Sequence, residues 1–423
     1  MIHFVRILLF LLATGVLSHY LPLTYWIAFS EKVEAPYTIY SSVLEDFAFY
    51  RFEESGIRYM DRSGVAYSEE AFQKITPLHN YLQLYHDGKL PDEIRGVPIS
   101  TKIIREQRTS LRLKAPELDF PGVALYPLMD SATGKVELET TGEFMRPGHR
   151  IELLDSKTNR LLSDKGRRFT EALADAGFVF PATAAYGNST TRKPYDEGYF
   201  LVDQAGTLFQ LQMKRGEPFV TKPAEVSADP LWQEIHPRHI LVSEQANKEL
   251  RCLIIGQDDS VWMVVGEGYR PVRVPFQHYL PAESSLRLSG NVLYVMLTVQ
   301  NDDWQESIVF NRSYDLLDTY SEALPSLERM PQGRIASVLF PWTLQFRSEG
   351  SGYIGFYAES GSPWSMLLSL ALALLSILFS VRRGSWSTSQ KIMSLLMLPT
   401  GIFGFVAYWC IPPAAPRQNR RIS

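Results

Sequence analysis

Apolar residues concentrate at the two ends of the chain, and the first apolar run predicts a membrane anchor. Residues 4–29 contain no acidic residue and begin near a single cation, Arg6. The run is long enough to cross a hydrocarbon core of about 30 Å. A basic residue before an apolar stretch that reaches small residues near Ser18 also fits a cleaved signal peptide. Continued hydrophobicity through Trp26 and Phe29 favours an uncleaved anchor over residues 1–29.

Two further apolar runs lie near the C-terminus. Residues 363–381 contain no charge and are the clearest membrane helix in the sequence. The run from 392 to 411 is interrupted by Pro399, Gly401 and Gly404, which membrane helices tolerate. We therefore expect two membrane helices within residues 362–411, joined by a basic loop at 382–391, and a tail at 412–423.

Basic residues beside the membrane segments predict the orientation of the chain. They are Arg6, Arg382, Arg383, Lys391 and, in the tail, Arg417, Arg420 and Arg421. The first four place the N-terminus and the basic loop in the bacterial cytoplasm and the middle of the chain outside the inner membrane. The tail conflicts with this rule. Either the third run crosses against it, or the run re-enters the membrane and returns.

The middle of the chain, residues 30–361, has the two-residue alternation of β-strands. The stretch 199–213 predicts a strand, a turn at 203–206 and an alternating strand. The same plan recurs at 252–265 and 286–311, and near Ile57. Hairpins at intervals of about 40–50 residues favour a mainly β extracytoplasmic domain, a β-propeller or another β-meander. A pair of β-sandwiches remains open, since hairpins of this kind occur in both.

Two helical inserts interrupt the strand pattern. The first begins after Ser68, a good N-cap with acidic residues in the following turn, and ends at Gly88. Pro77 is expected to kink or split it. The second covers residues 163–177, with Phe169 and Leu173 on one face and a terminating glycine.

Composition and motifs exclude several classes of function. The chain has 423 residues and a net charge of -4, which gives no electrostatic reason to expect nucleic acid as a partner. Two cysteines, Cys252 and Cys410, are too few for a cysteine-rich metal site. Phosphate-binding loops of the G-x-x-x-x-G-K-[ST] type and G-x-S-x-G nucleophile elbows do not occur in the sequence. We predict no cofactor.

The stretch "GNSTTRKPYDEGYF", residues 187–200, is the densest group of reactive side chains. Its three consecutive hydroxyl residues, 189–191, have no histidine nearby to act as a base, so catalysis is disfavoured and we name no catalytic residue. The main interpretation is a structural connection into the strand that opens at Tyr199. The alternative is contact with a partner or ligand. The residues that would make this contact are Arg192, Lys193, Tyr195, Asp196 and Glu197.

Metal chemistry has weak support elsewhere. His236 and His239 are three residues apart, but Pro237 opposes a helix and no third ligand lies at a suitable spacing. The acid pairs at 258–259 and 302–303 lack the rest of a calcium-binding loop. Both acid pairs are interpreted as turn acids, and we predict no metal site.

Four segments resemble a known family. They are "LQLYHDGKLPDEIRG", "VALYPLMDSATGKVEL", "RRFTEALADAGFVFPA" and "TTRKPYDEGYFLVD". They are similar to an uncharacterised family of bacterial membrane proteins, a domain of unknown function, frequently encoded beside ABC transporters. The resemblance implies a membrane-anchored envelope protein that is an accessory to a transporter, and no catalytic residues are known to carry over.

These observations leave three hypotheses. The first is a non-enzymatic envelope accessory protein that sits in the lipid bilayer and binds a partner or ligand for an ABC-type transport system, with transporter subunits as partners. The second is a membrane-tethered enzyme acting on an envelope glycan, peptide or lipid, which requires an acid–base pair converging from separate loops. The third is a structural or sensory domain, although the sequence has no cytoplasmic output module beyond the short basic loop.

Overall fold

The computed structural model describes residues 2–29, 35–53, 55–118, 124–132, 134, 138–325, 330–348, 354–383 and 387–411. The chain forms two compact units. Glu34–Leu324 is called the β domain here, and Met1–Val33 together with Pro325–Ser423 is called the helical unit. The predicted tail at 412–423 lies outside the described residues.

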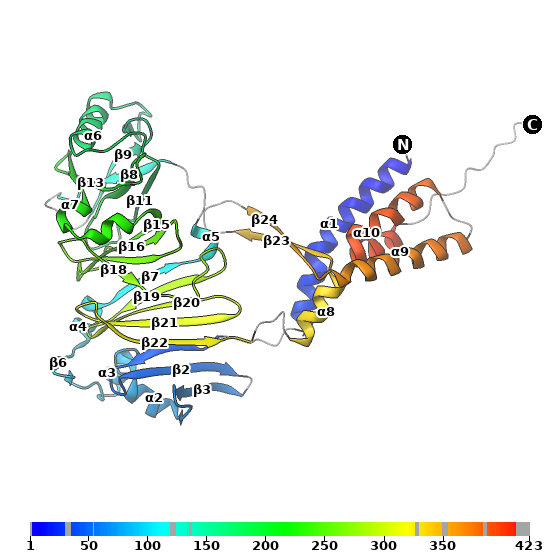
Figure 1. Ribbon diagram of the computed structural model, residues 1–423, viewed down its shortest axis with the longest axis horizontal. Coiled ribbons are helices and arrows are strands. Elements are labelled where there is room, and N and C mark those ends of the chain that lie inside the picture. Colours follow the sequence, from blue (N-terminus) through cyan, green and yellow to red (C-terminus); the bar gives the residue numbers. More distant parts are fainter. Residues whose placement is uncertain are drawn as a thin grey trace, which may run out of the picture. The chain divides into compact units, whose positions relative to one another are not determined.

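The described part of the β domain contains five larger antiparallel sheets (Figure 1). The first sheet comprises β1 (Tyr37–Ser41), β2 (Asp46–Glu53), β3 (Gly56–Asp61) and β4 (Ala66–Tyr67). The second comprises β8 (Tyr126–Met129), β9 (Thr140–Arg146) and β10 (Glu152–Asp155). The third comprises β11 (Ala184–Gly187), β12 (Tyr199–Val202), β13 (Leu208–Lys214) and β14 (Glu217–Thr221). The fourth comprises β15 (Pro237–Val242), β16 (Leu250–Gly256), β17 (Val261–Val265) and β18 (Arg270–Val274).

The fifth sheet departs from the simple meander. It comprises β19 (Ser285–Gly290), β20 (Tyr294–Gln300), β21 (Trp304–Asn311) and β22 (Leu316–Ala323), and β7 (Thr109–Leu113) pairs with β19 at its edge. Since β7 comes from the chain between the first and second sheets, it ties the two ends of the domain together. A small ladder pairs β5 (Glu93–Ile94) with β6 (Val97–Pro98). The mainly β prediction is confirmed, and no sheet among the described residues closes into a barrel.

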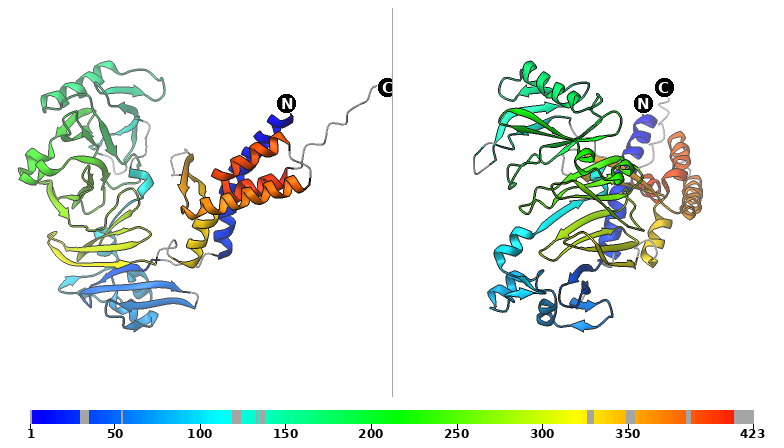
Figure 2. Two further views of the ribbon diagram at one scale, coloured as in Figure 1. Left: turned by 45° about the vertical axis from the view of Figure 1, so that its right-hand side comes forward. Right: turned by 60° about the vertical axis from the view of Figure 1, so that its left-hand side comes forward.

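The five sheets pack face to face in the order second, third, fourth, fifth, first. Buried hydrophobic clusters join each neighbouring pair. Representative members that share a cluster are Leu153 and Phe209, Phe200 and Trp262, Leu253 and Leu288, and Phe47 and Tyr294. Figure 2 shows from two further sides that the first sheet (blue) lies beside the fifth (yellow-green). Stacked sheets of this kind bury both faces, which explains the near-continuous apolar strands at 252–255 and 261–265.

Both predicted helical inserts are present. The first is split into α2 (Glu69–Ile75) and α3 (Tyr81–His86) around Pro77, and the Ser68 hydroxyl caps α2 by accepting from the Ala71 amide at 3.3 Å. The second is α6 (Ser163–Asp175), whose buried Phe169 and Leu173 cover the second and third sheets. Further short helices, which the periodicity did not predict, are α4 (Thr101–Gln107), α5 (Ala115–Leu118), α7 (Pro223–Ser227) and a 3₁₀ turn at Pro230–Glu234.

The helical unit contains the three apolar runs. Its elements are α1 (Ile2–Phe29), α8 (Pro331–Leu339), β23 (Trp342–Ser348), β24 (Ile354–Ser360), α9 (Trp364–Arg382) and α10 (Thr388–Cys410). Among the described helices, α1, α9 and α10 are long and apolar enough to cross a membrane. Residues 330–361 were grouped with the β-rich body by their strand pattern, but α8 and the β23–β24 hairpin belong to this unit. They do so because Ala336 and Phe340 pack with Phe403 of α10.

The third membrane helix is broken near its middle. Gly401 has φ 50° and ψ -128°, which no α-helix contains, and it follows Pro399. The freed carbonyl of Pro399 accepts a hydrogen bond from the Trp342 indole at 2.9 Å. A side chain at Gly401 would lie 2.7 Å from the Ser369 hydroxyl of α9, so only glycine fits the bend. The interruption seen in the sequence is therefore a break in α10.

Candidate functional site

The stretch singled out in the sequence forms the loop between β11 and β12 in the third sheet. Glycines at both ends hold this loop close to the sheet. Gly198 has φ +72°, and a Cβ there would lie 2.3 Å from the carbonyl oxygen of Leu211. A Cβ at Gly187 would lie 2.4 Å from the ring of Tyr199. The loop is therefore pressed against its own sheet rather than extended into solvent.

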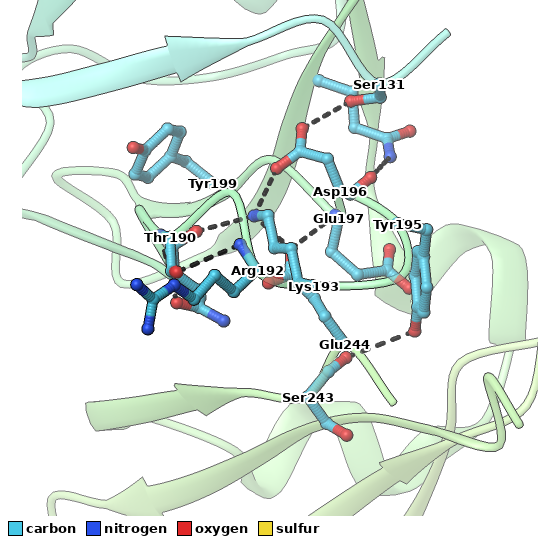
Figure 3. A network of polar contacts seen from close by, with 12 residues as sticks. Ser131, Thr190, Arg192, Lys193, Tyr195, Asp196, Glu197, Tyr199, Ser243 and Glu244 are labelled. Atoms are coloured by element: carbon cyan, nitrogen blue, oxygen red, sulfur yellow. Dashed lines mark hydrogen bonds and ion pairs between the residues drawn. The ribbon is translucent and has the colours of Figure 1, made fainter. Parts of the chain in front are cut away.

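Lys193 is the centre of a buried ion network (Figure 3). Only 3% of its side chain is exposed. Its ammonium group donates to the Asn188 carbonyl at 2.6 Å, to Asp196 Oδ1 at 2.6 Å and to Glu244 Oε1 at 2.7 Å. These three acceptors use all three ammonium protons, which is what a buried lysine requires to stay charged.

The two neighbouring acids connect the third sheet to the sheets on either side. Asp196 accepts from the Ser131 hydroxyl at 2.6 Å, at the end of the second sheet. Glu197 accepts from Arg251 of the fourth sheet at 2.5 Å and from the Gln210 amide at 2.6 Å. Hydrogen bonds to charged groups in a low-dielectric interior are the stronger kind, so the network fixes the packing of three sheets.

The network has more carboxylates than cations, and Glu244 is the carboxylate with an oxygen that has no hydrogen-bond partner. Two cations face three carboxylates, and one oxygen of Glu244, Oε2, is buried without a hydrogen-bond partner. Burial raises the pKa of Glu244 above its ordinary value of 4.5, against the opposing effect of the hydrogen bond from Lys193. Its other oxygen accepts the Glu197 amide at 2.7 Å. Burial of Glu244 therefore favours its protonated form.

The five predicted contact residues divide into interior and surface. Lys193, Asp196 and Glu197 come together in the network, and as whole residues they are 8%, 6% and 1% exposed. Tyr195 is half-buried, donates to the Ser243 carbonyl at 3.3 Å, and has the Lys248 ammonium 4.8 Å from its ring centre. Arg192 is exposed. The sequence pointed to the right segment for polar chemistry, but Glu244, Arg251 and Gln210 lie elsewhere in the chain and no local signal groups them with it.

A second polar site, a concave pocket, lies where the first and fifth sheets meet. Its volume is about 220 Å³, and its walls come from β1, the segment around α2 and α3, the end of α4, β7 and β19. Arg108 and Arg287 line it, and no acidic residue does. Neither arginine forms an ion pair with a described acid; Arg108 is exposed, whereas Arg287 is half-buried, and arginines at such sites are commonly paired.

One wall of this pocket is aromatic. The Tyr37 ring stacks on Tyr50 with centroids 4.9 Å apart, and the Arg287 guanidinium lies 4.3 Å from the centre of the Tyr37 ring. His79 lies at the mouth, 5.4 Å from Tyr37. Desolvation on its packed side, followed by the charges of Arg287 and Arg108, lowers the pKa of His79 below 6.5. The imidazole is thus neutral at pH 7 and supplies one donor and one acceptor.

A repeated sequence pattern was the missed signal for this pocket. Ser-Leu-Arg-Leu occurs at 110–113 and again at 285–288, and the two copies pair antiparallel with Arg112 directly opposite Arg287. Alternation places both leucine pairs in the core and both arginines on the other face. The pattern predicts strands, but only their pairing reveals that the two arginines share one face.

The histidine and turn-acid segments do not converge on a metal site within the described residues. His239 lies in β15 with its ring 5.2 Å from the ring of Tyr186. Asp258 accepts from the Ser260 amide in its own turn at 3.2 Å, as the turn interpretation expects.

No curated protein matches the sequence. A family profile described as "Domain of unknown function (DUF4857)" matches residues 37–310, which is more than half of the chain. The match begins at β1 and ends in β21, so it contains both the buried ion network and the pocket. The chain therefore belongs to the DUF4857 family.

Proposed function

We propose that this protein is a membrane-anchored, non-enzymatic accessory protein of an ABC-type transport system, and that its β domain binds a small ligand. The observation that carries the binding role is the pocket lined by Arg108 and Arg287. Cations without acidic partners in a concave site are costly to the folded protein unless a ligand uses them. They are the groups in the domain best placed for recognition.

The membrane location rests on the helical unit. Helices α1 and α9 have the length and apolarity of membrane spans. The basic residues lie near the start of α1, at Arg6, and at the end of α9, at Arg382 and Arg383. By the positive-inside rule, the β domain between these helices faces the outside of a bacterial inner membrane.

The contrast with an enzyme rests on the state of the acids. Asp196 and Glu197, the two acids of the 187–200 stretch, are both engaged by buried cations. Such pairing holds a carboxylate ionised and oriented, whereas a general acid or base needs reach to a substrate proton. This supports binding rather than reaction on an envelope glycan, peptide or lipid.

We further propose that the five stacked meanders are propeller-like blades, with the pocket at the seam between the first and the last. Pairing of β7 with the fifth sheet supports this, because it joins the start of the chain to its final sheet in the way that propeller seams are held. Seams and inter-sheet crevices are common places for ligand sites.

The transporter association rests on the family resemblance and is tested by co-purification. The full chain, tagged and expressed at native level in its host, is solubilised in mild detergent and isolated. We expect nucleotide-binding and membrane subunits of an ABC transporter in near-stoichiometric amounts, and none with an unrelated tagged membrane protein of equal abundance. Recovery of the chain alone under these conditions would overturn the accessory role.

A further inference from the structure

The charge on one face of the β7–β19 ladder requires a counterion. Arg112 and Arg287 are directly opposite on adjacent strands, and Arg108 precedes β7. Like charges at opposed positions destabilise a sheet. No described acid forms an ion pair with any of the three. In the buried network of the same domain every cation has a carboxylate partner, so the lack of one here is specific to this face.

The donors that remain free are arranged for recognition. The Arg287 guanidinium lies over the Tyr37 ring and makes no hydrogen bond to a described residue, so its N–H groups can bind a planar or tetrahedral anion. A second polar group also lacks a partner: the Ser42 hydroxyl is 3% exposed, lines the same pocket, and makes no hydrogen bond. A buried hydroxyl without a partner costs free energy that a ligand oxygen would recover.

The size of the pocket limits the ligand. A volume of about 220 Å³ equals about seven waters at about 30 Å³ each. A phosphate or carboxylate group with a single ring or sugar suits a pocket of this size. His79, which lines the pocket, offers a flat surface for such a ring.

We propose that the pocket binds a small organic anion, with its phosphate or carboxylate held by Arg287 and Arg108 and one of its oxygens reaching Ser42. This inference rests on the proposed ligand-binding function and deepens it. It assigns a ligand class to the pocket and a role to three residues outside the segment that the sequence singled out.

Calorimetric titration of the full chain in detergent tests it. The ligands are inorganic phosphate, glucose 6-phosphate, benzoate and, as a neutral reference, glucose. We expect saturable binding of at least one anion, weaker at high salt, and no binding of glucose. R287Q should weaken binding about tenfold or more, which is the range for a lost charge-assisted contact. S42A should weaken it less. R150Q, an exposed arginine whose partner Glu152 is also held by Arg146, should leave it unchanged.

The outcomes separate the ligand class from the function. If glucose binds and R287Q has no effect on it, the pocket binds a ligand but the anion proposal fails. If an anion binds equally well to R287Q and to wild type, the site lies elsewhere and the proposal also fails. If none of the four binds, the anion proposal fails for ligands of this size, while co-purification with a transporter tests the accessory role independently. Urea unfolding of each variant shows that lost binding is not lost folding.

A different observation concerns the course of α10 in the membrane. Its first half contacts the start of α1 through Ser389 and His3, 3.2 Å apart. Near its other end, Tyr408 hydrogen-bonds to Ser380, and the Trp409 ring lies 5.5 Å from Phe379. Residues 379–380 are at the end of α9 that leads into α10. Both ends of α10 therefore lie at the same end of the helical unit.

The break explains this course. At Gly401 the chain meets Ser369, which precedes Ser380 by three turns of α9, and then returns. The segments before and after the break, 388–400 and 402–410, are about 20 Å and about 14 Å long at about 1.5 Å per residue. Neither spans a core of about 30 Å. Protein surrounds the non-helical turn, which is the condition under which membranes accept one.

We infer that α10 is a re-entrant helical hairpin and that its last residue, Cys410, lies on the same side of the membrane as its first. Of the two courses that the sequence leaves open, this one satisfies the positive-inside rule for Arg417, Arg420 and Arg421. It requires that only α1 and α9 cross fully.

Cysteine accessibility in intact cells tests the topology. In a C410S background, S387C, S423C and S63C are treated with a membrane-impermeant maleimide before and after permeabilisation; Cys252 is fully buried and contributes no label. We expect S423C to behave as S387C does and opposite to S63C in the β domain. Labelling of S423C with the pattern of S63C would show that α10 crosses and would overturn the inference.

Discussion

Two polar sites of the β domain differ in how their cations are satisfied. Around Lys193, each cation has at least one carboxylate within 2.7 Å, and the side chains are almost inaccessible. In the pocket between the first and fifth sheets, Arg287 has an aromatic ring on one side and no acid. Every cation of the network has a carboxylate partner within the protein, and the arginines of the pocket have none among the described residues.

This difference separates structural from functional polarity. A network that satisfies itself stabilises the packing of sheets and loses folding free energy when any member is removed. A group of like charges does the opposite, because it costs stability in the free protein and is compensated only on binding. The two sites should therefore respond to loss of a cation with opposite signs.

Loss of Lys193, the central cation of the network, is expected to have the largest effect on stability. K193M leaves Asp196 and Glu244 buried without their cation, and we expect the free energy of unfolding of the β domain to fall by about 3–5 kcal/mol. Urea unfolding followed by tryptophan fluorescence measures it. R192Q, one position earlier and exposed, should change stability by less than about 0.5 kcal/mol. A loss below about 1 kcal/mol for K193M would mean that the network does not hold the sheets together.

The next largest effect on stability is expected from a substitution at Gly198, in the turn that brings the loop against its sheet. G198A places a methyl group against the Leu211 carbonyl in a backbone with positive φ, and should destabilise by about 1–3 kcal/mol. Gly206 provides a matched control, since it also has positive φ, at +80°, but a Cβ added there would meet no atom within 4 Å. Equal losses for G198A and G206A would show that close approach to β13 is unimportant.

A smaller effect concerns pH. Because burial raises the pKa of Glu244, its contribution to stability is fully present below its unfolded value near 4.5 and is lost as pH rises through the folded value. Wild-type stability should therefore contain a component that declines from about pH 4.5 upward. E244Q cannot ionise and should lack this component. Unfolding free energies at several pH values compare the two proteins, and parallel pH profiles would contradict the assignment.

The smallest effect has the opposite sign. R287Q relieves the repulsion with Arg112 and should leave the ligand-free protein as stable as wild type or more stable by up to about 1 kcal/mol. A double-mutant cycle with R112Q isolates this coupling. A clear loss of stability in R287Q would place Arg287 with the structural cations and remove the contrast between the two sites.

Much of the fold followed from local patterns. Alternation and turns located the hairpins of the third to fifth sheets, and Ser68 and Gly177 marked helix ends as they occur. The short helices α4, α5 and α7 escaped because a single turn or two has too little periodicity to detect. The pairing of β7 with the fifth sheet was not predicted, because pairing between strands distant in sequence leaves no local pattern.

The candidate residues followed the same division. Local density of polar residues led to the loop at 187–200, and the structure places three of its members in one network. Whether any of the five contacts a partner stays a prediction. Its two acids, Asp196 and Glu197, are buried, although a pair of acids after proline and tyrosine is typical of an exposed turn.

The sequence by itself determined the chemistry of each segment: which runs are apolar enough for a membrane, which alternate as strands, and where glycine and proline interrupt them. These properties depend on neighbouring residues and are therefore readable along the chain. Only the tertiary structure decided which charges meet. It gave Lys193 its acids from the third and fourth sheets, left Arg287 facing Arg112, and folded α10 back at Gly401, because such contacts join residues that are far apart in sequence.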